Sequence, residues 1–365
     1  MSQRKIRAVY MRGGTSRCLV FREGDLPHPG PARDRILLAA LGSPDPYGRQ
    51  LDGLGGGISS LSKACIVGAP SHPEADVDYT FAQVDVRSPV VEYHGNCGNC
   101  SSAIGPFAID ERLVAAQEGE TIVRVHNTNT KKVIVAHVPT RDGEAVIEGD
   151  FELAGVAGRG ARIALDFLEP GGAGTGRLLP TGSARDVIAG VEASCVDATN
   201  PLVFVRARDV GLTAGETPSA VDANADVMAR LEKIRVEAAM RMGLPTSASA
   251  PKIAFVAAPA DYVALDGVRH VAGDYDVLAR AISMGNCHRA FPLTSAMCLA
   301  VAARIEGTLV HEVARRHAGD VRLGHASGVL PLDAKVATRD GAPWAERVTV
   351  YRTARRLMEG FVRVP

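Results

Sequence analysis

Hydrophobic and polar positions along the chain follow two periods, one typical of strands and one typical of helices. VDYTFAQVDV (77–86) alternates apolar and polar residues, which predicts a half-buried strand. PKIAFVAAP (251–259) is a short apolar run, which predicts a buried strand. ADVMARLEKIRVEAAMRMGL (225–244) repeats its apolar positions at helical spacing and has a glycine near its end, which predicts an amphipathic helix. Because segments of both kinds alternate, the pattern predicts a mixed α/β (α+β) protein.

Two distant stretches contain the same tripeptide, Gly-Asn-Cys. HGNCGNCSSAIGPFAI (94–109) and MGNCHRAFPLTSAMCLAVA (284–302) each follow a β-rich segment, and in each the tripeptide precedes a run of small and apolar residues. This weak repeat suggests two similar halves, each a sheet around one apolar helix. We place the first domain at 1–150 and the second at 151–345, with a C-terminal strand at about 346–365 that packs back on the first.

Composition and charge exclude several classes of protein. The chain has 365 residues, and Lys+Arg and Asp+Glu balance at 41 each, so neither nucleic acid nor a membrane surface is an expected partner. Neither a transmembrane run of about 18 apolar residues nor the apolar region of a signal peptide is apparent. Seven cysteines are an odd number for a disulfide framework. We therefore expect a cytoplasmic protein with reduced thiols.

The turn HGNCGNC carries two cysteines, Cys97 and Cys100, three positions apart. A structural zinc site needs four ligands, so Cys287 and His288 would have to complete the pair. A redox-active pair is a second interpretation, and two buried thiols are a third. A catalytic thiol at the start of the helix predicted for SSAIGPFAIDERLVAA (101–116) is the fourth. The residues alone leave these interpretations open.

The catalytic interpretation has a physical basis. Backbone N–H groups at a helix N-terminus favour negative charge, so they can lower a thiol pKa or hold a carboxylate. Abstraction of a proton beside a carboxylate also needs a base that titrates nearer neutrality than free lysine. Lys63, in the apolar stretch GGGISSLSKACIV (55–67), is a candidate, because desolvation lowers a lysine pKa.

Several motifs together resemble one known family. MRGGTSR, GISSLSKACIV, HGNCGN, NTNTKK, GRLLPTG, DATNPLVFV and GHASGV occur in this order from about Val9 to Val336. Together they resemble the PrpF-type 2-methylaconitate cis–trans isomerase family. The resemblance implies a diaminopimelate-epimerase-like fold of two similar domains, each a curved sheet or partial barrel around a central helix, with the active site in the interdomain cleft. It also implies isomerisation of unsaturated di- and tricarboxylates without a metal or an organic cofactor.

The resemblance assigns residue roles. Lys63 and Cys97 match the family's catalytic lysine and cysteine, and Met11–Ser16 match a loop that contacts a substrate carboxylate. We predict that Lys63 and Cys97 transfer protons and that these residues contact substrate: Thr15, Ser16, Arg17, Asn96, Gly98, Asn99, Thr294, Ser295 and Ser327. We expect no cofactor and no metal, and a small polycarboxylate as the partner; a homodimer is compatible with this class.

Two departures from the family pattern bear on substrate and mechanism. Arg17 and Cys18 stand where the family usually has Lys-Gly. A second cysteine, which epimerases of this fold carry at the start of the second helix, is absent near Leu293. Rival functions are 4-oxalomesaconate tautomerisation or a methylitaconate-type Δ-isomerisation, an epimerase that uses Thr294, a non-catalytic partner of a dehydratase, and a zinc-binding module.

Overall fold

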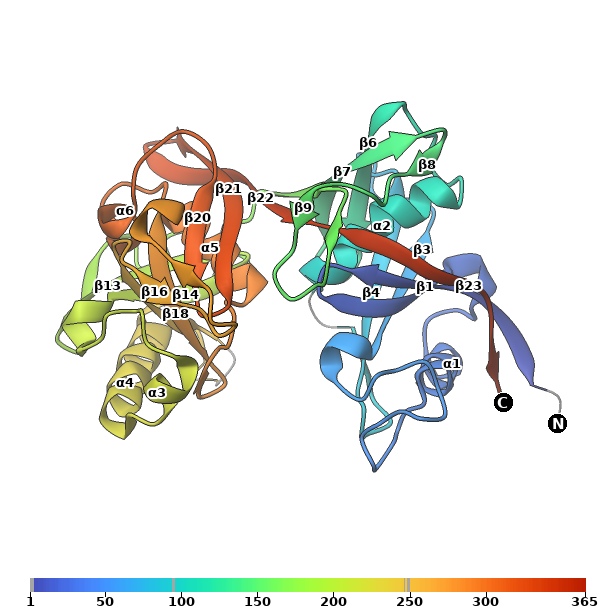
Figure 1. The fold of residues 1–365 in the computed structure, drawn as a ribbon, viewed down its shortest axis with the longest axis horizontal. Helices are drawn as coiled ribbons and strands as arrows, with labels where there is room; N and C mark the ends of the chain where they lie inside the picture. Colours follow the sequence, from blue (N-terminus) through green and yellow to red (C-terminus); the bar gives the residue numbers. More distant parts are fainter. Residues whose placement is uncertain (1–2, 94–95, 246, 248–249) are drawn as a thin grey trace. The chain divides into compact units, whose positions relative to one another are not determined.

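The computed structural model describes residues 3–365 except 94–95, 246 and 248–249. The chain forms two compact units (Figure 1). The first contains the chain up to Phe167 together with Tyr351–Pro365, and the second is Leu168–Val350. In the described part of the chain, no helix combines the length and the apolar character that crossing a membrane requires.

The first unit is built on one mixed sheet. Its strands are neighbours in the order β23 (Ala354–Val364), β1 (Arg4–Gly13), β2 (Ser16–Arg22), β3 (Lys63–Gly68), β4 (Val77–Val84), β6 (Gly119–Asn127), β7 (Lys132–Arg141) and β11 (Ile163–Leu168). The pairs β2–β3 and β4–β6 are parallel and the others are antiparallel. Short strands β5 (Val91–Glu92) and β8 (Glu144–Ala145) pair antiparallel with β4 and β7, and β9 (Phe151–Glu152) pairs with β10 (Arg159–Gly160).

Helix α2 (Gly98–Asp110) is the core of this unit. It contacts β1, β2, β3, β6 and β7, and its residues from Cys100 to Ile109 are buried. A Cβ on Gly105 would lie 2.7 Å from Val138 Cγ2, so glycine lets the helix lie close to β7. Helix α1 (Pro31–Leu41) packs Ile36 and Leu37 on the other face of the sheet, and the short helices η1 (Glu23–Asp25) and η2 (Ser59–Leu61) lie in the connections.

The second unit has the same kind of sheet. Its strands are neighbours in the order β12 (Asp186–Ile188), β13 (Val191–Ala198), β14 (Asn200–Arg206), β15 (Lys252–Ala257), β18 (Val277–Ser283), β20 (Val321–His325), β21 (Gly328–Arg339) and β22 (Ala342–Arg352). β19 (Asn286–Cys287) pairs antiparallel with the end of β18, and β16 (Tyr262–Val263) pairs with β17 (Arg269–His270). The pairs β14–β15 and β18–β20 are parallel.

Two helices cover this second sheet. The predicted amphipathic helix is α4 (Ala225–Arg241), which buries Leu231, Ile234 and Ala238 in the core. Helix α5 (Leu293–Ala302) contacts β13, β14 and β21 and is buried from Ser295 onward. The remaining short helices are α3 (Pro218–Asp222), α6 (Leu309–Val313), η3 (Ala207–Val210) and η4 (Ala272–Asp274).

The two units repeat one topology. In each unit an antiparallel strand pair is followed by an outer helix, which leads to a third strand parallel to the second. This third strand forms a second antiparallel pair with a fourth, and a buried helix then leads to a fifth strand parallel to the fourth. The two similar halves suggested by the Gly-Asn-Cys repeat are therefore present, although the two tripeptides occupy different backbone positions. Cys97 caps α2, whereas Cys287 lies in β19 beyond the tight turn at Met284–Gly285, and Pro292 caps α5.

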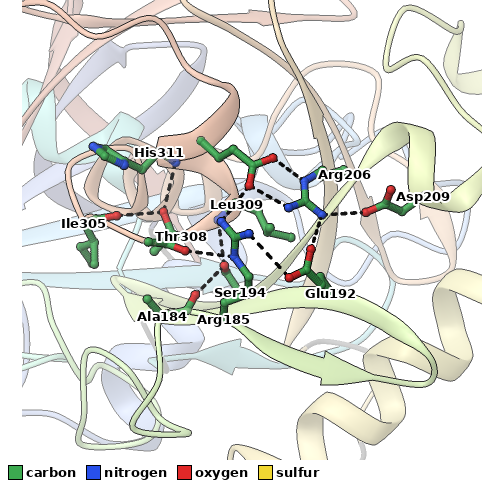
Figure 2. Close-up of polar contacts among 12 residues, drawn as sticks. Ala184, Arg185, Glu192, Ser194, Arg206, Asp209, Ile305, Thr308, Leu309 and His311 are labelled. Atoms are coloured by element: carbon green, nitrogen blue, oxygen red, sulfur yellow. Dashed lines mark hydrogen bonds and ion pairs between the residues drawn. The ribbon is translucent and has the colours of Figure 1, made fainter.

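An ion-pair network joins α6 to the sheet of the second unit (Figure 2). Arg206, 7% exposed at the end of β14, bonds both carboxylate oxygens of Glu312 at 2.7 Å. It also bonds Glu192 at 2.8 Å and Asp209 at 3.0 Å. Arg185 reaches Glu312 at 2.8 Å. The hydrogen bond from Arg206, supported by both positive charges, lowers the pKa of Glu312 to about 2.

We predict that Glu312→Gln destabilises the protein by about 1 kcal/mol at pH 7, since solvent screens a carboxylate that is about a third exposed. The folded pKa of about 2 lies below the unfolded value of 4.5, so the stabilisation is present above pH 4.5 and is lost as pH falls toward 2. Urea unfolding followed by circular dichroism should show the gap from wild type narrowing between pH 7 and about pH 2.5. Exposed Glu306→Gln is the control, and a gap independent of pH would contradict the assignment.

Candidate active site

Cys97 stands at the N-terminus of α2 as its N-cap residue. Its Sγ accepts the backbone N–H of Cys100 at 3.5 Å, and the helix begins at Gly98. Free backbone N–H groups and the positive end of the helix dipole are found at such a position. His94 and Gly95 of the motif lie outside the described residues.

The Cys97 thiol is held in its neutral form. A side-chain hydrogen bond with Cys100 and burial raise its pKa well above the usual range, while the nearby Lys63 ammonium partly lowers it. Cys97 is half-buried, whereas the other six cysteines are buried. A neutral, reachable thiol is suited to donate a proton.

Lys63 is the first residue of β3 and is only 8% exposed. Its Nζ donates to Gln83 Oε1 at 2.8 Å and lies 4.9 Å from the centre of the Phe81 ring. The Gln83 amide is itself fixed, because it donates to the carbonyls of Ser59 at 3.1 Å and Ser62 at 2.9 Å. Lys63 points to the same face of β3 as Cys65, whose Sγ lies near that of Cys100 in α2, so the positioned amine lies on the α2 side of the sheet.

Three further thiols lie behind Cys97 in the core. Cys18, Cys65 and Cys100 come from β2, β3 and α2, and their sulfur atoms lie within 4.8 Å of one another. Tyr79 Oη is 3.9 Å from Cys65 Sγ. Among the described residues this is the group whose geometry could hold a soft metal ion. Cys287 and His288, the completion considered from the sequence, are not part of it.

The Gly-Gly turn of the MRGGTS motif lies against the first turn of α2. A Cβ on Gly13 would be 2.6 Å from the Asn99 carbonyl oxygen, and one on Gly14, where φ is +51°, would be 2.3 Å from Asn99 Oδ1. Thr15 donates its backbone N–H to the same Oδ1 at 3.4 Å. Both glycines are therefore required for this close approach, which explains the motif.

The polar residues predicted near Cys97 are mostly brought together. Asn96 Oδ1 accepts from Ser101 Oγ at 3.1 Å and from Asn127 Nδ2 at 3.5 Å, which fixes its amide beside the cap. Gly98 is the first helical residue, and Asn99 follows it in the same turn. Ser16 opens β2 and is 3% exposed.

Arg17 is not brought to this group. In β2 it alternates with Cys18, whose side chain faces α2, so Arg17 faces the other side of the sheet. There its guanidinium lies 5.5 Å from the centre of the Tyr10 ring. The structure therefore argues against the expected contact between Arg17 and a substrate bound at Cys97.

The sequence reasoning missed Arg352. This residue ends β22 and is 5% exposed. Its Nε donates to Asn99 Oδ1 at 3.1 Å, in the helix turn that Cys97 caps, and burial lowers its pKa. A separation of 253 residues between Arg352 and Asn99 gives no local pattern that could have found it.

The remaining predicted contacts belong to the second unit. Thr294 and Ser295 lie in the first turn of α5; the Thr294 carbonyl accepts from Thr199 Oγ1 at 2.8 Å. Ser295 Oγ is buried and has no hydrogen-bond partner among the described residues. Ser327 donates through Oγ to the Arg289 carbonyl at 2.6 Å.

Comparison with known proteins places the chain in a family. The family model described as "PrpF protein" matches residues 3–365. A 3-methylitaconate isomerase of Eubacterium barkeri is 43% identical, with 99% of this chain and 98% of that protein covered. A 2-methyl-aconitate isomerase of Cupriavidus necator is 42% identical, with 100% of this chain and 98% of that protein covered.

Solved structures agree. The crystal structure of a methylitaconate-delta-isomerase superposes with a TM-score of 0.93 at 42% identity, covering 100% of this chain and 96% of the other. A probable proline racemase from Agrobacterium radiobacter K84, 12% identical with a TM-score of 0.52 over 99% and 93% of the two chains, shares the fold alone. The expected epimerase-like fold is confirmed, and the chain is an isomerase that belongs to the PrpF protein family.

Proposed function

We propose that this isomerase moves a proton and a double bond within a small unsaturated polycarboxylate of the 2-methylaconitate type. The observation that carries the proposal is the pairing of a fixed Lys63 amine with a neutral Cys97 thiol at the N-terminus of α2. The names of two relatives, a 2-methyl-aconitate isomerase and a 3-methylitaconate isomerase, support the substrate class. Seven unpaired cysteines support a reducing compartment, for which we propose the cytoplasm.

In the proposed mechanism the two side chains divide the proton transfers. Lys63, as the free amine, takes a proton from the allylic carbon, and the electron pair spreads through the C=C bond into the carboxylate at its far end, which gives a dienolate. The Cys97 thiol then donates its proton to the carbon at the other end of the conjugated system. Lys63 is left as an ammonium and Cys97 as a thiolate, and one proton passing between them restores both. Their mutual electrostatic interaction supports this last step.

Substrate contacts are proposed at the same end of α2. Backbone N–H groups of Gly98 and Asn99, with Asn96 beside them, would hold one carboxylate where charge develops. Thr15 and Ser16 would contact a second carboxylate from the glycine turn. The roles assigned from the sequence to Thr294, Ser295 and Ser327 stay predictions.

A dicarboxylate Δ-isomerisation is the second candidate, favoured by the 43% identity to a 3-methylitaconate isomerase. The same acid and base serve both reactions, so a substrate panel separates them. The purified protein is mixed in D2O with 2-methylaconitate, cis-aconitate, 4-oxalomesaconate or methylitaconate, and each mixture is followed by proton NMR. A new isomer with deuterium at the allylic carbon supports the proposal and identifies the substrate. Absence of exchange with every acid would contradict it.

We predict that Lys63→Ala and Cys97→Ser each lower kcat about 10²–10⁴-fold, because each removes one proton-transfer group. Circular dichroism should show that both variants keep the fold. Lys233→Ala, on the exposed face of α4, is the matched control and should retain wild-type turnover. Full activity in both site variants would rule out this acid–base pair.

We predict that alkylation of Cys97 by iodoacetamide accelerates only at pH values above the ordinary thiol pKa of about 8.5. The raised pKa keeps the thiol protonated below that range, and only the thiolate reacts. Mass spectrometry of the intact protein measures the rate, and Cys97→Ser identifies the site because the other six cysteines are buried. A rate that reaches its plateau below pH 8 would mean a thiolate and would reverse the assigned roles.

A further inference from the structure

Arg352 is a buried cation beside the proposed site. The residue is 5% exposed, its Nε donates to Asn99 Oδ1 at 3.1 Å, and its Nη1 donates to the Tyr351 carbonyl at 2.7 Å. No described residue accepts a hydrogen bond from Nη2, and no described carboxylate forms an ion pair with the guanidinium. Both bonds that it makes are to neutral oxygens.

Most other buried arginines of this chain have a carboxylate partner. Those with comparable exposure are Arg33, Arg206, Arg235 and Arg280. Arg206 and Arg235 each bond a carboxylate oxygen at 2.7 Å, and Arg33 lies 3.6 Å from one. Arg280 instead lies 5.4 Å from the centre of the Tyr262 ring, on which a cation is stabilised. Arg352 has neither kind of compensation among the described residues.

The described groups that bond Arg352 carry no negative charge. Its Asn99 partner lies in the first turn of α2, where the helix dipole is positive. The Cys97 thiol, two positions before Asn99, is neutral and supplies no compensating charge. Burial accordingly lowers the pKa of Arg352 to about 10. An isolated buried charge is costly, so a site with this charge distribution is suited to an anionic ligand.

The chemistry of the guanidinium specifies that anion. Its planar fork matches a carboxylate, and the free Nη2 can donate to one of the two carboxylate oxygens. Asn99 holds the fork by Nε, so little side-chain entropy is lost when a ligand binds. Because Asn99 lies in the helix turn that Cys97 caps, a carboxylate bound by the guanidinium would lie near the thiol.

We propose that Arg352 binds the substrate carboxylate attached to the carbon that Cys97 protonates, an inference that rests on the proposed function. Arg352 thereby makes a carboxylate at that position a requirement of the substrate. It also stabilises the dienolate, whose negative charge grows on this carboxylate as the proton leaves. Its loss therefore lowers kcat as well as raising KM.

The experiment compares Arg352→Met, Arg352→Lys and Arg352→Ala with Arg355→Met, an exposed arginine three positions along the chain. Steady-state kinetics use the acid that wild type turns over. Propane-1,2,3-tricarboxylate, which cannot isomerise, is the binding probe in calorimetry. We expect Arg352→Met to lower kcat/KM and probe affinity by about 30-fold or more. The kcat/KM and probe affinity of Arg352→Lys should lie between those of wild type and Arg352→Met, because lysine keeps the positive charge and loses the planar guanidinium. Guanidinium ion should restore part of the kcat of Arg352→Ala.

If the wild-type protein turns over an acid and Arg352→Met shows nearly the same kinetics and probe affinity, the assignment is overturned. Loss of activity without loss of probe affinity and without rescue by guanidinium would also overturn it, since a structural role predicts that result. If Arg352→Met does not fold, Arg352→Lys decides the question. Near-normal kinetics and probe affinity in Arg352→Lys would overturn the assignment, and a parallel loss of kcat and probe affinity in Arg352→Lys would support it. If the wild-type protein exchanges deuterium into none of the acids, the proposed function is refuted. Loss of probe binding in the Arg352 variants alone would in that case still support the anion site.

Discussion

The position of the reactive thiol depends on close contact between the Gly13–Gly14 turn and the first turn of α2. Any side chain on either glycine would overlap the backbone or the amide of Asn99. This contact prevents the first turn of α2 from moving closer to the sheet, and it therefore fixes the position of Asn99. Its Oδ1 then serves both Thr15 N and Arg352 Nε. Strand β1, helix α2 and the end of β22 thus meet at one amide group.

Burial determines the chemistry at this point. Cys97 sits where a helix N-terminus would favour a thiolate, yet the hydrogen bond with Cys100 and desolvation raise its pKa. The outcome is a neutral Cys97 thiol in the same helix turn as Asn99, which holds the buried Arg352 guanidinium. In the proposal above, a substrate carboxylate supplies the negative charge that this guanidinium lacks. On that proposal, burial accounts both for the affinity for the anion and for the protonation state of the acid.

Much of the fold could be predicted from local patterns. The apolar spacing of α4 and the strand alternation around Thr80 persist because local preference and tertiary packing agree there. The fold, with its two similar halves, followed from ordered motifs. The two Gly-Asn-Cys tripeptides do not have the same local structure, because one ends at a helix cap while the other crosses a hairpin turn. A short match cannot distinguish these backbone conformations.

The candidate site could be predicted only where its residues are close in sequence. The SK and GNCGN motifs contain Lys63, on the α2 side of β3, and Cys97, at the start of α2. The motif also suggested Arg17, but strand alternation sends that side chain to the Tyr10 face. The buried cation near the thiol comes instead from Arg352, which sits in a charged C-terminal stretch and resembles a surface residue in the sequence. Tertiary contact across 253 residues determines its environment, and no local pattern reports that contact.

The two units share a topology but differ in chemistry. Helix α2 begins behind a thiol, whereas α5 begins behind Pro292, which can neither give nor take a proton. A two-thiol epimerase needs acid and base on opposite faces of one carbon, with a cysteine at each helix start. Here the proposed acid and base both come from the first unit and act on each other's charge. Neighbouring groups of this kind remove and return a proton on one face of a planar intermediate. That geometry suits a proton shift along a conjugated system better than inversion at a single carbon.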